Sequence, residues 1–338
     1  MKGKSRKEKG QTRDRPFFPF SFCLFPFSCN ATFLGLLALL LWSTTIAASR
    51  SLAEKLGPLT AGAAVSFLAG ALGLLAQLPK GNPASRLLAL PRRYVAGCGA
   101  CFVVCTASLS VAIGLAADHT QVLAVGLLNY LWPVLTIIFS LPLLKRKARV
   151  GLVPGTLLAL CGIFLVIMQG SHVSVRTLIE NVSANPLVLA LGLAAAISWA
   201  LYSNLARLWG GQHADGAVPA FFLASGLVLL AIRMVRPEVS TINARALAET
   251  AFLGVATALG YVFWDISMRK GNAVLVVACS YAMPLLSTPI SCIYLGVMPA
   301  ASLWLGCILI ISGSVISRCS VDERPSAAAS SSPESISP

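Results

Sequence analysis

Charged side chains are scarce in this sequence. Asp, Glu, Lys and Arg make up 11% of the 338 residues, and only 12 residues are acidic. A soluble domain carries roughly a quarter charged residues, so a soluble globular fold is excluded. Hydrophobic residues reach 57% and lie in long continuous runs, not in the short alternating segments of a β-barrel. The composition therefore predicts an all-α membrane protein with many crossings.

Motifs for ATP-driven or hydrolytic chemistry are also missing. The sequence has no GxxxxGK[ST] phosphate loop, and neither HExxH nor GxSxG occurs. Nearly all of the ten cysteines lie in apolar runs, where cysteine acts as a small hydrophobe. Cys98, Cys101 and Cys105 share one helix face, but no histidine in that segment completes a metal or haem site. We therefore expect no enzyme activity, no cofactor and no metal.

The net charge of +14 raises the question of a nucleic-acid partner. Most of the 26 basic residues, however, fall in short loops on one side of the spans if the N-terminus is inside; Lys145, Arg146 and Lys147 form one such loop. Basic loops stay in the cytoplasm. We therefore expect no nucleic acid, the lipid bilayer as surroundings, and an inner (plasma) membrane location with both termini cytoplasmic. The oligomeric state stays open.

Ten apolar segments are long enough to cross a bilayer as helices. They are residues 31–49, 58–78, 94–116, 121–141, 150–168, 186–208, 217–235, 245–268, 273–294 and 301–317. Residues 1–30, basic and then rich in Phe and Pro, are expected to be a disordered cytoplasmic tail. The Ser/Ala/Pro-rich residues 319–338 are expected to be a second disordered tail, and residues 169–185 an external connector.

The ten segments contain an internal repeat. Tyr130-Leu-Trp-Pro-Val-Leu135 in the fourth segment matches Tyr281-Ala-Met-Pro-Leu-Leu286 in the ninth, and Trp42 in the first pairs with Trp199 in the sixth. At the offset of the first match, Gly155 pairs with Gly306 and Gly162 with Gly313. Five spans are therefore duplicated, as 31–168 and 186–318, and an odd number inverts the second copy. Inverted repeats are typical of alternating-access transporters, which bind a small molecule near mid-membrane; a duplicated enzyme or scaffold is a remote alternative.

The candidate substrate site surrounds Asn129-Tyr-Leu-Trp-Pro133 in the fourth segment. Proline bends a helix, so Pro133 and its counterpart Pro284 are candidate hinges. Trp132 and Tyr130 diverge by about 200° on an ideal helix, and Trp132 is the favoured contact for a flat apolar ligand. The remaining candidates are Asn129 and Ser280 as hydrogen-bonding groups, with Tyr281, Trp199 and Trp264; their alternative roles are helix packing and an interfacial aromatic belt.

Two ionisable residues are candidates for coupling transport to protons. Asp265 is an acid inside a span, which marks a functional residue by default. Arg269 follows four residues later, in the acid-first spacing that favours a structural ion pair on a helix. His119 lies in a tight external turn, where it would be solvated or would sense external pH.

The sequence also resembles a known family. Ten spans as five plus five, Leu41-Trp42-Ser43, and proline-containing fourth and ninth spans are similar to the drug/metabolite transporter superfamily with EamA-type repeats. Residues 125–133 and 153–160 resemble the YddG-type aromatic amino acid exporters. The resemblance implies an exporter of aromatic or other bulky hydrophobic amino acids. Thiol-rich Cys105-Thr-Ala-Ser108 and Asp265 depart from that pattern, so a multidrug or nucleoside-type metabolite exporter is the alternative.

Overall fold

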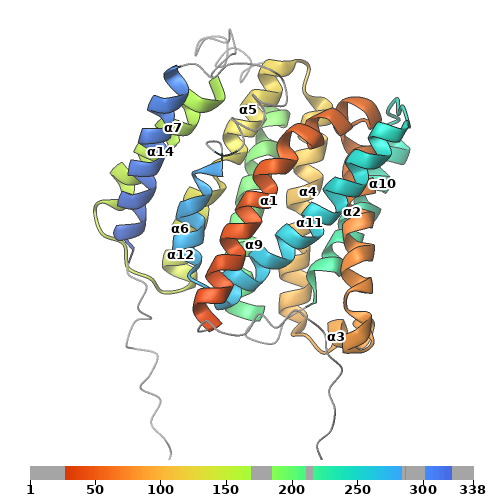
Figure 1. Ribbon diagram of the computed structural model, residues 1–338, viewed down its shortest axis with the longest axis horizontal. Helices are drawn as coiled ribbons and strands as arrows, with labels where there is room; N and C mark the ends of the chain where they lie inside the picture. The colour runs from red at the N-terminus through yellow and green to blue at the C-terminus, as the bar shows by residue number, and fades with distance from the viewer. Residues whose placement is uncertain (1–26, 169–184, 211–215, 284–285, 287–300, 322–338) are drawn as a thin grey trace, which may run out of the picture.

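The computed structural model describes residues 27–168, 185–210, 216–283, 286 and 301–321. All regular elements in these ranges are helices, which run up and down a single bundle (Figure 1). One isolated bridge, between Ala148 and Val321, is the only β-type pairing in the described residues. The expected all-helical class is therefore confirmed for the part of the chain that the structure describes.

Long helices alternate with short connections along the chain. The elements are α1 (Phe27–Leu56), α2 (Pro58–Leu75), the 3₁₀ turn η1 (Leu78–Lys80), α3 (Pro83–Leu88), α4 (Arg92–Leu115), α5 (His119–Asn129), α6 (Trp132–Leu143), α7 (Leu152–Met168), α9 (Pro186–Gly210), α10 (Val218–Val235), α11 (Ala244–Lys270), α12 (Ala273–Ser280) and α14 (Ala301–Cys319).

Seven of the spans in the described residues are long and apolar enough to cross a membrane, and two more apolar helices, Leu152–Leu165 and Trp304–Ser317, are shorter. The ninth expected segment, 273–294, begins as α12 and then passes largely outside the described residues. Most of residues 1–30, 169–185 and 319–338 lie outside them as well. The described parts of the two expected tails are ordered, since α1 begins at Phe27 and Val321 forms the bridge to Ala148.

The fourth expected span overlaps one apolar stretch, Ala124–Leu143, and a two-residue turn divides it into α5 and α6. α5 ends at Asn129, Tyr130 is its C-cap, and α6 begins at Trp132 after a two-residue turn. Pro133 therefore lies in the first turn of α6, where its missing N–H leaves no helix bond unmade. α12 ends at the matching position, with Tyr281 as its C-cap. The break falls at matching positions of the repeat, and in the first copy it lies in the turn before Pro133, where proline leaves the Asn129 carbonyl without its N–H partner.

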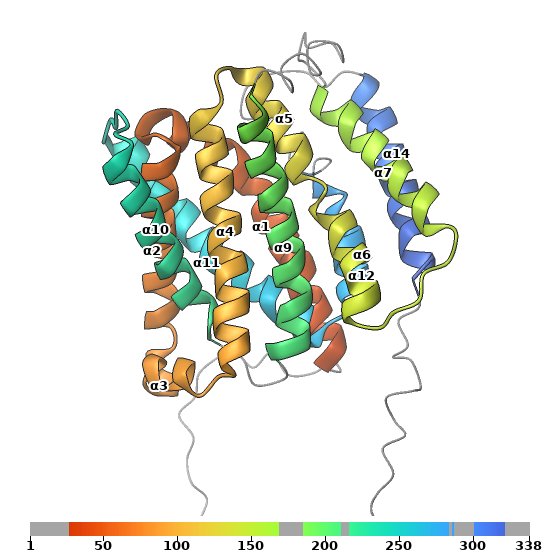
Figure 2. The ribbon, with the colours of Figure 1, turned by 180° about the vertical axis from the view of Figure 1, so that it is seen from behind.

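Helices far apart in sequence pack as neighbours. α1 packs along α11, α4 along α9, α2 along α10, and α7 along α14 (Figures 1 and 2). α3, the loop between α6 and α7, and the C-terminal end of α14 lie at one end of the bundle, here named the α3 end. The first helix of each long pair thus belongs to the first half of the chain and the second to the other half.

Glycine sets the distance between α7 and α14. A Cβ added at Gly162 would lie 2.6 Å from the carbonyl oxygen of Gly306, and one at Gly313 would lie 2.5 Å from that of Gly155. Such contacts are far inside van der Waals separation, so only glycine permits this approach. Small residues at helix contacts are how membrane helices come close enough for dispersion forces to hold them.

Polar contacts join the two halves at the end opposite α3. Lys55 at the end of α1 pairs with Glu249 of α11 at 2.8 Å. Glu238 accepts hydrogen bonds from the backbone N–H groups of Leu59 and Thr60, each at 3.0 Å, in the first turn of α2. A carboxylate at a helix N-terminus satisfies donors that have no partner within the helix. These bonds fix α1 and α2 against the segment from α10 to α11.

Candidate functional site

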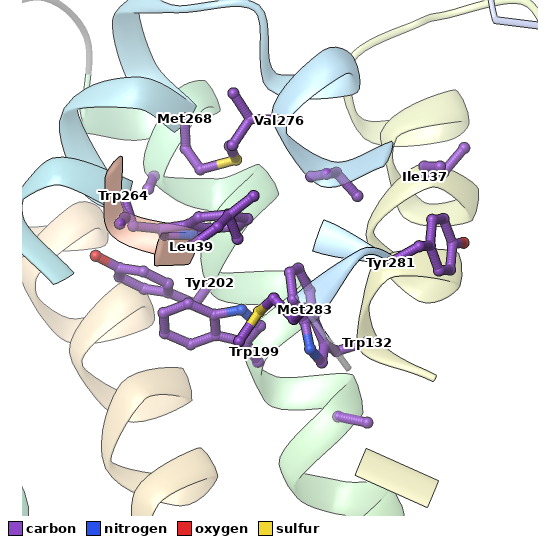
Figure 3. Close-up of a cluster of buried hydrophobic side chains, with 14 of the residues drawn as sticks. Leu39, Trp132, Ile137, Trp199, Tyr202, Trp264, Met268, Val276, Tyr281 and Met283 are labelled. Atoms are coloured by element: carbon purple, nitrogen blue, oxygen red, sulfur yellow. The ribbon is translucent and has the colours of Figure 1, made fainter. Parts of the chain in front are cut away.

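A cluster of aromatic side chains fills the middle of the bundle and includes three of the expected site residues. The Trp132 ring, from the first turn of α6, lies 5.3 Å from the Trp264 ring of α11 and 6.4 Å from the Trp199 ring of α9, measured between centroids. Both contacts are edge-to-face, the arrangement that aromatic quadrupoles favour. Figure 3 shows the three indoles converging. Trp264 is therefore buried, and the alternative of an interfacial belt is wrong for it.

The cluster extends to aromatic residues that were not among the predicted site residues. Trp42 of α1 lies 5.8 Å from Trp199, and Tyr261 of α11 lies 5.0 Å from Trp42. Phe102 of α4 lies 5.3 Å from Tyr261. The repeat held the signal for Trp42, because it is the counterpart of Trp199. Phe102 lies in an apolar helix with no pattern that separates it from ordinary packing.

One polar group in this cluster has no partner. The indole Nε1 of Trp42 is buried and makes no hydrogen bond with any described residue. It lies against Gly260, where a Cβ would come within 2.7 Å of it. By contrast, the indole N–H of Trp264 donates to Ser203 at 3.2 Å. A buried donor without a partner loses the hydrogen bonds that it makes in water, so Trp42 is suited to an acceptor on a bound molecule.

Met283 completes the central cluster from the opposite repeat position. It is the counterpart of Trp132, it is 9% exposed, and its thioether lies beside the rings of Trp132 and Trp199 (Figure 3). A methionine is flexible and polarisable, so it adapts to ligands of different shape. The two residues before the matching prolines are therefore brought together, one from each half of the chain.

Asp265 lies at the α3 side of this cluster, in a closed polar network. Its Oδ2 accepts two hydrogen bonds from Arg269, at 2.9 and 2.8 Å, and both side chains are almost fully buried. Its Oδ1 accepts from the hydroxyls of Tyr202 at 3.1 Å and Tyr94 at 3.4 Å. The expected acid-first pair within α11 is therefore formed. The tyrosine hydrogen bonds to the same carboxylate join α11 to α4 and α9. The two tyrosines were not predicted.

The other predicted residues near the helix breaks lie outside the ring cluster. Tyr130 and Tyr281 are the C-caps of α5 and α12, and no ring contact joins either of them to the cluster in the described residues. Figure 3 shows Tyr281 near Ile137, away from the indoles. Asn129 is half-buried at the end of α5. Ser280 is buried, and its hydroxyl donates to the Val277 carbonyl at 2.6 Å, a bond within α12.

The structure does not test the predictions for His119 and Pro284. His119 begins α5, after Asp118 caps the helix by accepting from the Gln121 N–H at 2.8 Å. The histidine side chain itself lies outside the described residues. Pro284 also lies outside them, so the second hinge stays a prediction. In the described residues, no group of three or more His, Cys, Asp or Glu side chains is placed to hold a metal ion.

Comparison with known proteins identifies transporters. The aromatic amino acid exporter YddG of Escherichia coli K12 is 30% identical over 291 residues, which are 85% of this chain and 96% of that protein. The protein of the same name from Salmonella typhimurium is 30% identical over 292 residues, 86% of this chain and 97% of that one. A solved crystal structure matches with a TM-score of 0.71 at 27% identity, covering 85% of this chain and 97% of the other.

The family model described as the EamA-like transporter family matches this sequence twice. The first match spans residues 30–168 and the second spans residues 186–319. Together they cover most of the chain and every helix that contributes to the aromatic cluster. This protein therefore belongs to the EamA-like transporter family.

Proposed function

We propose that this protein is an inner-membrane exporter of aromatic or other bulky hydrophobic amino acids. Two relatives that bear the name aromatic amino acid exporter align with nearly their whole length. The observation that carries the proposal is the central cluster, in which Trp132, Trp199, Trp264 and Trp42 converge from four helices of both family matches. An aromatic side chain that enters this cluster finds edge-to-face partners on several sides.

The chemistry of the cluster fits an amino acid with a flat side chain. Each aromatic pair adds about 0.5–1.5 kcal/mol beyond the burial of apolar area. The unpartnered N–H of Trp42 supplies a donor for a carboxylate oxygen at the edge of the rings. Asn129 at the end of α5 is the proposed second polar contact. Tyr130, Ser280 and Tyr281 are proposed as the backing of the site.

The rings are closed on one another in this conformation. Trp132 and Trp199 are each 6% exposed, and Trp264 is 0% exposed. A substrate therefore reaches them only when the helices that carry them separate. We place the hinge at the turn formed by Tyr130 and Leu131, with Pro133 ensuring that α5 cannot continue into α6. Pro284 is the proposed hinge of the second copy.

We further propose ten membrane spans, arranged as two inverted repeats over residues 31–168 and 186–318. The helix pairs support this arrangement. A two-fold relation that exchanges the halves turns the α1–α11 contact into the α9–α4 contact, and it maps α2–α10 and α7–α14 onto themselves; these are the principal pairs. The glycine contacts obey the same exchange, since the pair Gly162–Gly306 becomes Gly313–Gly155.

The proposed orientation places the α3 end in the cytoplasm. That end carries the loop Lys145-Arg146-Lys147, and the described ends of α1 and α14 nearest the termini also lie there (Figure 1). Reporter fusions check this orientation. Fusions at Lys147 and at Arg176 are expected on opposite sides of the membrane. If both report the same side, α7 does not cross the membrane and the duplication of five spans is wrong.

The alternative of a multidrug or nucleoside-type exporter loses its main support. It rested on two departures from the exporter pattern, the thiol-rich segment Cys105–Ser108 and Asp265, and only Asp265 would have offered a negative charge to a cationic substrate. Arg269 neutralises that charge through two hydrogen bonds, and two tyrosine hydroxyls occupy the other oxygen. We propose that Asp265 holds the structure together and does not carry the coupling proton.

Export from cells tests the proposed function. Cells that express the protein are loaded with labelled phenylalanine, tryptophan or leucine, and efflux is compared with cells that lack it. Faster efflux of the aromatic amino acids is expected, with a smaller effect for leucine. Unchanged efflux of all three, together with increased efflux of a cationic dye or a nucleoside, would contradict the substrate assignment. A Trp132→Ala variant serves as the control for binding at the cluster.

A further inference from the structure

The ring of Trp199 meets its neighbours in two different ways. Tyr202 is stacked on it, with 5.1 Å between the ring centroids and 30° between the planes, and Figure 3 shows the two side chains together. The rings of Trp132 and Trp42 meet it edge-on, at 87° and 70°. Tyr202 lies three residues further along α9, on the same side of the helix. Trp199 is therefore backed by a residue of its own helix, while the rings from α6 and α1 present their edges to it.

Tyr202 is held at its ring and at its hydroxyl. It is fully buried, and Phe102 of α4 meets its ring edge-to-face at 5.4 Å. Its hydroxyl donates to Asp265 at 3.1 Å, and two hydrogen bonds from Arg269 hold that carboxylate. A tyrosine side chain has two rotatable bonds, so a hydrogen bond at its far end and a ring contact at its side leave it little freedom. The ion pair of α11 thus fixes the ring on which Trp199 stacks.

Tyr94 binds the same carboxylate oxygen but does not contact the indoles. Its hydroxyl lies 3.4 Å from Oδ1 of Asp265, and it is also fully buried. In the part of the chain that the structure describes, its ring meets that of Phe221 at 6.1 Å and meets no indole. The two tyrosines therefore share a polar partner and differ at their rings, which makes Tyr94 a natural control for Tyr202.

The tilt of the Trp199 ring matters more for an aromatic ligand than for an aliphatic one. Attraction between two rings arises from their quadrupoles and depends on the angle and offset at which they meet. Burial of an aliphatic side chain is non-directional and follows the apolar area that leaves water. A Trp199 ring held at one tilt therefore favours an aromatic side chain. A ring that is free to tilt still buries an aliphatic side chain.

We propose that Tyr202 determines the preference for aromatic over aliphatic amino acids, because it holds Trp199 at the tilt that a substrate ring requires. Tyr202 is a positioning residue, which acts on the substrate through Trp199. Asp265 and Arg269 act one step further away, by fixing the hydroxyl of Tyr202. This inference rests on the proposed function, since it requires an aromatic amino acid at Trp199. It gives the buried ion pair a role in substrate choice as well as in stability.

Binding of phenylalanine and of leucine to the purified protein tests this role, with each affinity measured per folded molecule. Tyr202→Phe keeps the stacked ring and removes the hydroxyl. We expect it to lower the preference for phenylalanine over leucine by about 2- to 10-fold, the worth of one oriented ring contact, and to leave leucine binding nearly unchanged. Tyr94→Phe removes a hydroxyl from the same carboxylate oxygen, so it should also lower the melting temperature, but it should keep the preference.

A second background isolates the path through the ion pair. In the double variant Asp265→Leu, Arg269→Leu the hydroxyl of Tyr202 has lost its carboxylate, so the preference should already be reduced. Adding Tyr202→Phe to it should then reduce the preference no further. An unchanged preference in folded Tyr202→Phe, an equal loss in Tyr94→Phe, or a further loss in the double variant would overturn the role of Tyr202 alone. A wild-type protein with no preference for phenylalanine would contradict the proposed function instead.

Discussion

The α7–α14 pair and the aromatic core are built on opposite principles, although both lie in one bundle. Where α7 meets α14, the contact is made by glycines, and the backbones approach so closely that a single Cβ would collide. Where α1, α6, α9 and α11 meet, the contact is made by the largest side chains in the chain, with ring centroids 5.3 to 6.4 Å apart. In the first region, backbone atoms of the two helices meet directly at the glycines. The second consists of rings that can separate.

This difference indicates which region moves during transport. A glycine contact depends on backbone positions, so it is rigid and holds α7 and α14 together as a unit. Aromatic side chains are joined by weak edge-to-face contacts that a substrate ring can replace. We therefore expect substitutions at the glycines to change stability alone. Substitutions at the rings should change both stability and substrate affinity. The predictions below test this contrast between the two regions, beginning with the largest expected loss of stability.

The largest effect on stability is expected at the buried ion pair beneath the rings. Arg269→Gln leaves the Asp265 carboxylate without its charged partner. The side chains of Arg269 and Asp265 are only 1% and 3% exposed, so water cannot replace that partner. Breaking a buried pair on one side destabilises a protein by about 3–5 kcal/mol. The melting temperature of the purified variant measures this loss.

The double variant Asp265→Leu, Arg269→Leu is the control for that change. It removes both charges and is expected to recover much of the lost stability, since a buried pair replaced by apolar groups is often nearly neutral. If transport persists in the recovered double variant, Asp265 is structural. Lost transport with recovered stability would assign Asp265 to proton coupling instead.

An intermediate effect is expected at the glycine contacts. Gly162→Ala and Gly313→Ala each add a Cβ within about 2.6 Å of backbone oxygen, and overpacking of this kind destabilises by about 1–3 kcal/mol. Gly126→Ala is the matched control, because a Cβ there meets no atom within 4 Å. We expect Gly162→Ala and Gly313→Ala to lower the melting temperature and Gly126→Ala to leave it unchanged. Substrate affinity per folded molecule should be unchanged in all three variants. A change in substrate affinity at Gly162→Ala would remove the distinction between the two regions.

The smallest effect is expected at the partly exposed pair of Lys55 and Glu249, at the end opposite α3. Glu249→Gln weakens a contact whose side chains are 21% and 11% exposed, and such pairs contribute about 1 kcal/mol or less. The change should favour the conformation in which this end opens. Labelling of a cysteine introduced at Ser51, which contacts Glu249 at 2.8 Å, measures the opening in a background whose native cysteines are replaced by serine. Labelling should be faster in Glu249→Gln than in the protein that keeps Glu249. Slower or equal labelling would show that the Lys55–Glu249 contact does not hold this end closed.

The repeat made much of this structure predictable. It indicated that Trp132 and the residue before Pro284 occupy matching places, and Met283 indeed lies beside Trp132. It could not show that α5 and α6 are separate helices, because Tyr130 and Leu131 have no residue type that forbids a helix. The turn follows from Pro133, which cannot donate into the preceding turn, together with the packing of Trp132 into the core.

Partners that lie far apart in the sequence could not be predicted. Asp265 and Arg269 share a helix, so their spacing indicated the pair. Tyr94 and Tyr202 reach the same carboxylate from α4 and α9, across 171 and 63 residues, and no local pattern connects them.

The affinity of folded Trp132→Ala for an aromatic amino acid tests the central claim most directly. Trp132 is packed in this conformation, so the variant should melt earlier in any case, and only affinity per folded molecule separates the two roles. Ile137→Ala, a buried change five residues along α6 that removes no aromatic ring, is the control for lost packing. We predict a loss of about 2–3 kcal/mol, roughly 30- to 150-fold in Kd, for Trp132→Ala. Trp132→Phe should retain most of the affinity, and Ile137→Ala nearly all of it. Unchanged affinity in the folded Trp132→Ala fraction would contradict the assignment of the aromatic core as the substrate site.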